Sequence, residues 1–199
     1  MEQKEIWNKI APEWNKFRVN QIEEVQEFLK DKKGDILDLG CGTGRNLQKI
    51  NGTIYGIDFS EEMIKLAETN ANKKQINSEF KVSSLEKLPF KDNLFDSAIY
   101  IASLHCIPTK KRRERSLKEL FRVLKPNSRA LITVWSKTHP KLMKHPKEAT
   151  ITWKHNSEEL QRYYYLYDKE ELKKKLENLG FRIISINETK NIVAIVEKI

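Results

Sequence analysis

The segment Leu37–Arg45, LDLGCGTGR, places three glycines at alternate positions directly after a short apolar run. Because glycine has no Cβ, such a loop lets the backbone turn tightly and approach a ligand closely. The apolar run over residues 35–40 predicts a buried strand, and residues 44–50 predict a helix. This segment therefore predicts the strand–loop unit at which open α/β sheets bind ligands.

Outward from this unit, strand and helix patterns alternate along the chain. Further strands are predicted at 53–58, 79–83, 95–103 and 129–135, and helices at 21–31, 60–74, 110–125 and 169–180. Residues 181–188 and 191–198 predict a closing antiparallel pair. The pattern favours an α/β fold with a doubly wound, mostly parallel seven-stranded sheet and one antiparallel strand near an edge.

We expect residues 1–199 to form a single domain, without an internal repeat or linker. Residues 1–33 would form an N-terminal helical lid. Residues 136–168 follow the fifth strand and predict an irregular insertion on the substrate side. This segment would lie at the carboxyl edge of the sheet, where α/β proteins bind ligands.

The charge balance favours an anionic partner. The chain of 199 residues has 37 Lys and Arg against 28 Asp and Glu, a net charge of +9. Nucleic acid is the first interpretation and a membrane surface the second, although a lysine-rich proteome gives the same balance. Cys41 and Cys106 do not form a CxxC pair, so neither a metal site nor a disulfide framework is expected. Without a targeting or membrane-spanning run, we expect a cytoplasmic location and no membrane association.

Two carboxylates flank the glycine loop. Asp38 precedes Gly40 by two residues, and Asp58 closes the second strand, 18 residues after Gly40. A carboxylate at position 38 suits an ammonium group, or a water bound near one, better than a pyrophosphate. Asp58 is placed to accept hydrogen bonds from ribose hydroxyls.

The DxGxGxG loop, the acid that closes the second strand and LPFKDNLFDSAIY (88–100) together resemble the class I S-adenosylmethionine-dependent methyltransferases, over residues 34–135. The resemblance implies a Rossmann-like methyltransferase fold with S-adenosylmethionine as cofactor. It implies that the cofactor contacts Asp38, Gly40, Gly42, Gly44, Asp58 and Ser84. The family commonly has an acid near position 84, from which this chain departs.

Three further segments are distinctive: IWNKIAPEWNKFR (6–18), IASLHC with TKKRRER (101–115) and RYYYLYDKEEL (162–172). They resemble the tRNA wobble-uridine carboxymethyl methyltransferases. This resemblance implies esterification of the carboxylate of 5-carboxymethyluridine at position 34 of tRNA, and a small zinc-binding activator protein as partner. The chain departs from the family at Cys106, where a second histidine is usual, and after Trp135.

Arg18 and His105 are the candidate catalytic residues, because a cation can orient one oxygen of a carboxylate that is already ionised. For each, a surface arginine or a buried structural histidine is the alternative. Nucleotide contacts are expected from Lys110, Arg112, Arg113, Arg162, Tyr163 and Tyr165. The runs 110–115 and 136–148 are basic and would contact phosphates.

Two other functions remain open. A small-molecule methyltransferase of the quinone or sterol type shares LPFKDNLFD, and it would need an apolar pocket rather than basic runs. A binding module that keeps the cofactor site without transferring a methyl group is the third hypothesis.

Overall fold

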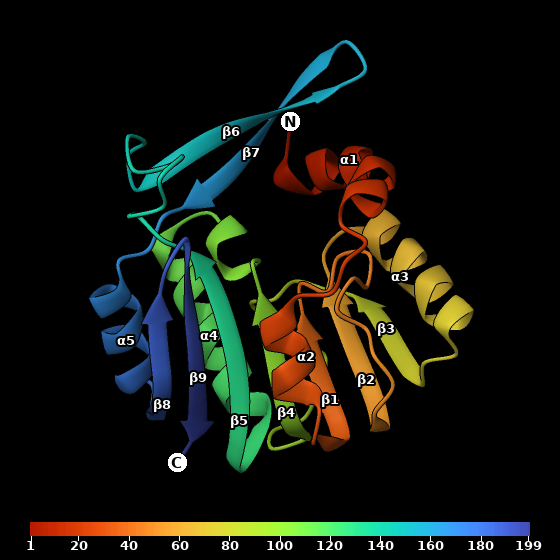
Figure 1. The fold of residues 1–199 in the computed structure, drawn as a ribbon, viewed down its shortest axis with the longest axis vertical. Coiled ribbons are helices and arrows are strands. Elements are labelled where there is room, and N and C mark those ends of the chain that lie inside the picture. Colours follow the sequence, from red (N-terminus) through yellow and green to blue (C-terminus); the bar gives the residue numbers. More distant parts are fainter.

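The computed structural model describes residues 1–199 and is built around a seven-stranded sheet with the order β3-β2-β1-β4-β5-β9-β8 (Figure 1). Six strands share one direction, while β9 is antiparallel to its neighbours β5 and β8. The predicted sheet is confirmed. The strands are β1 (Lys33–Leu39), β2 (Asn51–Asp58), β3 (Ser78–Val82), β4 (Phe95–Ile101), β5 (Leu124–Trp135), β8 (Phe181–Glu188) and β9 (Asn191–Lys198).

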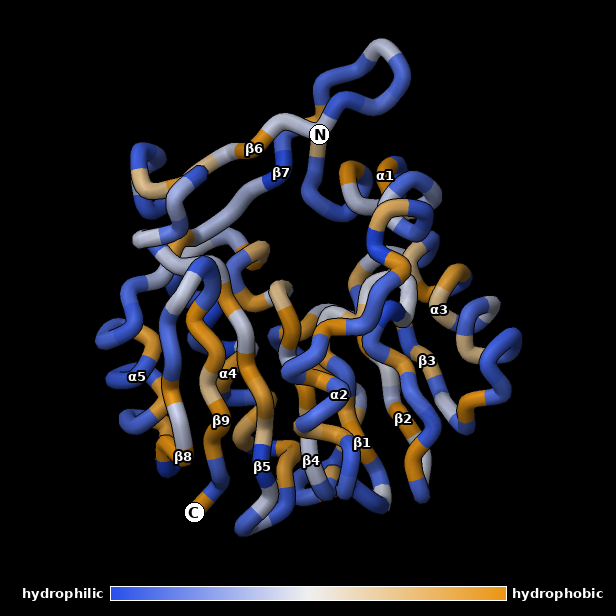
Figure 2. The backbone as a smooth tube through the Cα atoms, in the orientation of Figure 1, coloured by the Kyte–Doolittle hydropathy of each residue, from blue (hydrophilic) through white to orange (hydrophobic).

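Helices cover both faces of this sheet because side chains on its strands alternate between faces. Leu37 on β1 belongs to the larger core, which packs against α4 and α5, whereas its neighbour Ile36 packs with α2 on the other face. Figure 2 shows hydrophobic residues concentrated along the strands. The helices are α1 (Gln3–Phe17), α2 (Glu23–Leu29), α3 (Glu61–Lys74), α4 (Lys110–Val123) and α5 (Lys169–Glu177), with a short 3₁₀ turn η1 (Leu104–Cys106). No helix combines the length and apolarity that crossing a bilayer requires.

The predicted helix over residues 44–50 is wrong. Residues 42–46 form turns, and no helix follows before β2. The backbone carbonyls that would accept helical hydrogen bonds are engaged by distant side chains instead. Asn70 donates to the Thr43 carbonyl at 2.8 Å, and Gln21 donates to the Asn46 carbonyl at 3.0 Å.

The segment 136–168, expected to be irregular, contains an antiparallel hairpin of β6 (Glu148–His155) and β7 (Glu158–Tyr165). Tyrosine favours strands, which accounts for much of the RYYYLY run. Along β7 the side chains alternate. Arg162 and Tyr164 share one face and hydrogen-bond to each other, while Tyr163 and Tyr165 both contact Arg113 from the other face.

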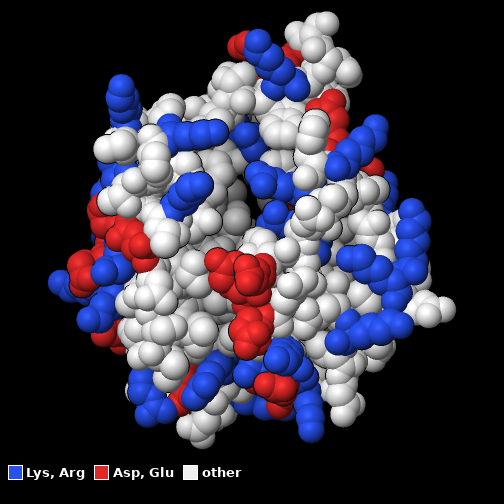
Figure 3. Space-filling view, in the orientation of Figure 1, with Lys and Arg blue, Asp and Glu red and all other residues white.

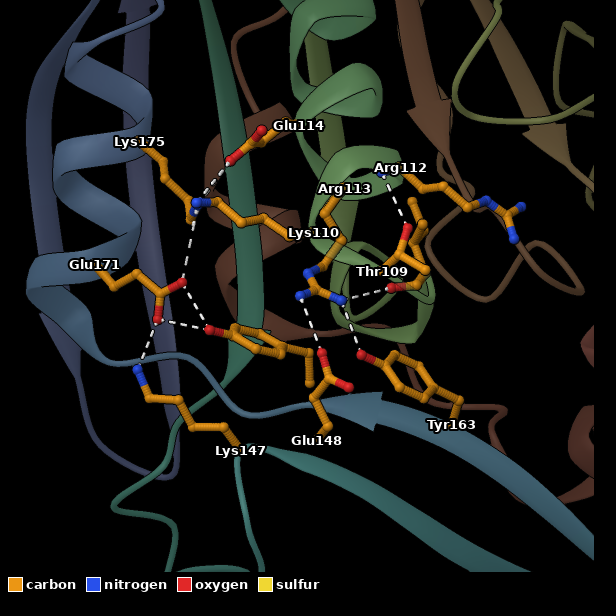
Figure 4. A network of polar contacts seen from close by, with 12 residues as sticks. Thr109, Lys110, Arg112, Arg113, Glu114, Lys147, Glu148, Tyr163, Glu171 and Lys175 are labelled. Atoms are coloured by element: carbon orange, nitrogen blue, oxygen red, sulfur yellow. Dashed lines mark hydrogen bonds and ion pairs between the residues drawn. The ribbon is translucent and has the colours of Figure 1, made fainter.

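Arg113 ties this hairpin to α4 and is only 4% exposed (Figure 4). Its guanidinium donates to the Ile107 carbonyl at 3.0 Å and to the Tyr163 hydroxyl at 2.9 Å. It also lies 3.9 Å from the centre of the Tyr165 ring and 3.8 Å from a Glu148 oxygen. The expectation that Arg113 binds nucleotide phosphates is therefore not met, since its donors are used inside the protein.

We expect Arg113→Ala to lower the free energy of unfolding by about 2 kcal/mol, because it leaves buried acceptors without donors. Urea unfolding monitored by tryptophan fluorescence measures the loss. Lys111→Ala on the same helix is the matched control, because Lys111 is exposed and has no ion pair. A loss for Arg113→Ala no larger than that for Lys111→Ala would contradict the anchoring role.

Candidate cofactor and substrate site

A cavity of about 630 Å³ lies at the carboxyl ends of the parallel strands and beneath α1. It reaches the ends of β1 and β4, where the strand order reverses and doubly wound sheets bind their ligands. Its lining combines the glycine loop, the ends of neighbouring strands and the inner face of α1. The lining includes Trp7, Trp14, Gly40, Gly42, Arg45, Asp58, Ser84, Glu86, Cys106 and Arg112.

The glycine loop needs its glycines for two different reasons. Gly40 has a φ of +66°, and a Cβ there would lie 2.4 Å from the Ser103 side chain at the end of β4. Gly42 has a φ of +55°, and its backbone N–H donates to Asp58 at 3.0 Å. A Cβ at Gly42 would meet no atom closer than the Met63 sulfur, 4.0 Å away. Gly40 thus permits close packing of β1 on β4, and Gly42 offers open backbone to a ligand.

Asp38 lies under this loop as a buried carboxylate without a partner. The residue is 1% exposed, and neither of its oxygens accepts a hydrogen bond from the protein. Burial, and secondly the charge of Asp58, raise the pKa of Asp38 to about 7. Buried polar groups are normally paired, so these oxygens mark a place that a ligand cation completes.

Asp58 differs from Asp38 because it is partly satisfied. It accepts hydrogen bonds from the backbone N–H groups of Gly42 and Ser60, both at 3.0 Å, and burial raises its pKa to about 6. Because Asp58 lines the cavity, it can still accept hydrogen bonds from hydroxyl groups of a ligand.

These groups fit S-adenosylmethionine. The orphaned Asp38 carboxylate suits the ammonium of its amino-acid part, and Asp58 suits its ribose hydroxyls. Ser84 lines the expected adenine end, where its hydroxyl accepts a hydrogen bond from the Glu86 N–H at 3.2 Å. Glu86 itself lines the cavity and binds Arg112 at 2.6 Å, so a carboxylate is present two residues after the expected position.

Three arginines around the cavity have no carboxylate partner. Arg45 lines the cavity directly after the glycine loop and forms no ion pair. Arg18 lies over the Trp14 ring at 5.0 Å. Arg162 is 6% exposed, donates to the Tyr164 hydroxyl at 2.6 Å and keeps its Nε unpartnered. Arg45 was not predicted, although an arginine directly after a ligand-binding loop was a usable signal.

Arg162 is held by an aromatic cage. Its guanidinium lies 4.9 Å from the Trp153 ring, 5.2 Å from Tyr164 and 5.7 Å from both Trp7 and Trp14. Such contacts fix a cation in place without neutralising its charge. Arg162 and Arg18 share the Trp14 ring, which lines the cavity.

The expectation that His105 acts as a cation is wrong. The ring is fully buried, stacks on Trp135 at 5.0 Å and accepts a hydrogen bond from the Trp135 N–H through Nδ1. Burial lowers the pKa of His105 to about 3, so it is neutral at physiological pH. Within the η1 turn, Cys106 lines the cavity in its place, and burial raises the pKa of this thiol to about 12.

The other residues that were expected to contact the nucleotide do not lie together at the cavity. Arg112 reaches the cavity, whereas Lys110 is exposed and lies 3.9 Å from Glu114. Tyr165 donates to Glu171, and the Tyr163 hydroxyl accepts from Arg113 (Figure 4). Tyr163 lines a second cavity of about 520 Å³, which shares Gln3 and Pro108 with the first.

We expect Asp38→Asn to stabilise the cofactor-free protein and to weaken cofactor binding. The folded pKa of about 7 lies above the ordinary 3.8, so the stability associated with protonated Asp38 is lost as pH rises through 7. At pH 8 the variant should gain about 2–4 °C in Tm, equivalent to about 1 kcal/mol. At pH 5.5, where wild-type Asp38 is mostly protonated, the gain should be smaller. Calorimetry should show cofactor affinity at least about tenfold weaker. An equal Tm gain at both pH values would contradict this account.

Comparisons with known proteins agree with this site. A family model described as a methyltransferase domain matches residues 30–180. The mouse protein named probable tRNA methyltransferase 9B is 30% identical over 152 residues, which are 74% of this chain and 32% of the mouse protein. The chain thus spans about a third of that relative's length. The Schizosaccharomyces pombe protein named tRNA (carboxymethyluridine(34)-5-O)-methyltransferase is 28% identical, over 90% of this chain and 88% of that protein.

Among solved structures, an S-adenosylmethionine-dependent methyltransferase from Methanosarcina mazei superposes with a TM-score of 0.74 at 27% identity. The match covers 90% of this chain and 99% of the other. The glycine loop, the orphaned Asp38 and the strand-end part of the cavity lining fall within the matched region, whereas Trp7 and Trp14 precede it. The chain therefore belongs to the methyltransferase domain family, with S-adenosylmethionine as its cofactor.

Proposed function

We propose that this chain methylates the carboxylate of 5-carboxymethyluridine at the wobble position of tRNA. The observation that carries the proposal is a set of three guanidinium groups without an ion pair: Arg45 lines the cavity, and Arg18 and Arg162 lie against the lining residue Trp14. The printed names of the mouse and S. pombe relatives, and the net charge of +9, support tRNA as the substrate.

The charge balance of the cavity favours an anionic substrate. A buried cation without a counterion is costly, so Arg162 indicates that a ligand supplies negative charge. The cofactor brings one carboxylate, and the proposed nucleoside brings a second. A neutral quinone or sterol would leave Arg162 unpaired, so the small-molecule alternative is disfavoured.

Ester formation on a carboxylate makes modest chemical demands on the protein. A carboxylate is ionised at neutral pH, so no general base is required, and the neutral His105 and the protonated Cys106 are consistent with this. When bound, S-adenosylmethionine supplies an electrophilic methyl group. The protein's contribution is then to orient the substrate and exclude water, which can supply on the order of 7–11 kcal/mol.

Arg162 is the residue best placed to orient the substrate carboxylate. Its planar fork suits a carboxylate, and the aromatic cage limits its freedom of movement. One end of the fork is held by the Tyr164 hydroxyl, while Nε has no partner. Trp7 and Trp14 line the cavity beside it and would exclude water from the bound carboxylate.

The zinc-binding activator that the resemblance implies stays a prediction. β3 and β8 are the two edge strands of the sheet and are the positions at which a partner could extend it by pairing. Copurification with a candidate activator, followed by a β3 variant with Phe80→Pro, would test pairing at that edge.

Methyl transfer from labelled S-adenosylmethionine to tRNA, followed by digestion to nucleosides, tests the function. We expect the label in a base-labile ester on a wobble uridine of tRNA that carries 5-carboxymethyluridine. Label in a lipid extract would instead indicate the quinone or sterol activity. Cofactor binding without transfer to either would indicate the binding module.

We expect Arg162→Gln to lower kcat/KM for tRNA by at least about a hundredfold, or about 3 kcal/mol, while the cofactor Kd changes less than twofold. Arg162→Lys should be intermediate, because an ammonium keeps the charge but lacks the fork. The matched control is Arg182→Gln, an arginine on β8 that binds Glu197. Equal losses of tRNA activity and cofactor affinity in Arg162→Gln would assign Arg162 to the cofactor instead.

A further inference from the structure

Four aromatic rings lead from the cavity to the protein surface. Trp7 and Trp14 line the cavity and contact each other edge to face at 5.2 Å. Trp14 lies 5.7 Å from Trp153 on β6, and Trp153 lies 6.1 Å from Phe17. The row ends in Phe17, which is 70% exposed at the carboxyl end of α1.

Exposure alone does not make Phe17 functional, because isolated apolar side chains are common on protein surfaces. What sets Phe17 apart is a rigid support next to an open cavity. Its neighbour Trp153 donates through Nε1 to Glu13 at 2.9 Å, and His155 contacts the same carboxylate at 3.0 Å. These bonds join the hairpin to α1, so the outer end of the aromatic row is fixed.

The surroundings of Phe17 are basic. Lys16 and Arg18 flank it in sequence. The Glu13 carboxylate, one turn before Phe17 on α1, accepts the hydrogen bond from Trp153. Figure 3 shows a hollow bordered by Lys and Arg side chains below the hairpin. An exposed ring among cations is the combination that single-stranded nucleic acids recognise.

We infer that Phe17 is a stacking platform for the base next to the modified uridine in single-stranded RNA. The inference rests on the proposed function, because it takes the target nucleoside to occupy the cavity. A strand leaving that cavity can pass Phe17, whose ring offers an aromatic face, while Lys16 and Arg18 offer cations for phosphates. A membrane surface fits less well, because the exposed apolar side chains here are Phe17 and Val19 rather than the broad face that an interfacial helix presents.

The test uses an anticodon stem-loop RNA that contains 5-carboxymethyluridine, with 2-aminopurine replacing either adjacent base. Stacking of 2-aminopurine on Phe17 should quench its fluorescence when wild-type protein binds. We expect Phe17→Ala to abolish this quenching at one of the two positions and to weaken RNA binding on the order of tenfold. Phe17→Tyr should retain both properties, and the cofactor Kd should be unchanged in each variant.

Salt dependence separates stacking from charge. Phe17→Ala should keep the wild-type slope of log K against log salt, whereas Lys16→Gln should reduce the slope by about one phosphate contact. Ile184→Ala is the matched control, because Ile184 is also exposed and apolar but lies on β8. It should bind RNA like the wild type.

Three results would overturn the inference. If Phe17→Ala binds RNA and quenches the fluorescence as the wild type does, Phe17 does not contact the RNA. Binding of wild type to anionic phosphatidylserine vesicles that is lost in Phe17→Ala, with RNA binding intact, would assign the ring to a membrane. A wild type that binds the cofactor but neither binds nor methylates the RNA would refute the proposed function, and the inference with it.

Discussion

The close approach of β1 to β4 at the glycine loop is the constraint on which the site depends. Because Gly40 has no Cβ, the loop can pack against Ser103, and because Gly42 exposes its N–H, it can hold Asp58 at 3.0 Å. The same packing removes water from Asp38 and leaves its carboxylate without a donor. The geometry that makes the loop a ligand site therefore also creates a buried charge, which destabilises the free protein until a ligand cation pairs with it.

α1 and the β6–β7 hairpin form the roof above the strand ends, and they come from distant parts of the chain (Figure 1). α1 and the β6–β7 hairpin are joined by Gln3, which donates to the Gln161 carbonyl at 3.0 Å and accepts from the Tyr163 N–H at 2.9 Å. Arg162 is caged only because Trp7 and Trp14 from α1 meet Trp153 from β6 around it. Loosening of either segment would therefore release the guanidinium, so under the proposed function substrate orientation would depend on a closed roof.

The sheet could be predicted from sequence because its signals are local: short apolar runs, alternating faces and glycines at one loop. The same local reasoning failed wherever tertiary contacts decide. Residues 44–50 lose their helix because side chains from α3 and from the segment before α2 bind the carbonyls of Thr43 and Asn46. His105 was expected at the cavity because it ends a strand, but the η1 turn directs it into the core and Cys106 outward. The KKRRER run predicts one basic patch. In the structure, however, Arg112 of this helix binds Glu86, and Arg113 binds the hairpin.

Carboxylates lie at the strand ends of the cavity and two unpaired arginines lie at its roof. This arrangement affects where each of two ligands binds. The strand ends carry the carboxylates Asp38 and Asp58 together with Arg45, whereas Arg18 and Arg162, which have no carboxylate beside them, sit against the aromatic rings of the roof. The carboxylate of the proposed substrate would be repelled from the strand ends and attracted to the roof, while the ammonium of the cofactor would have the opposite preference. Such preferences are stronger inside a protein than they would be in solution. The separation of charges thus disfavours binding of the cofactor and the substrate in each other's positions. It does not require any residue to gain or lose a proton.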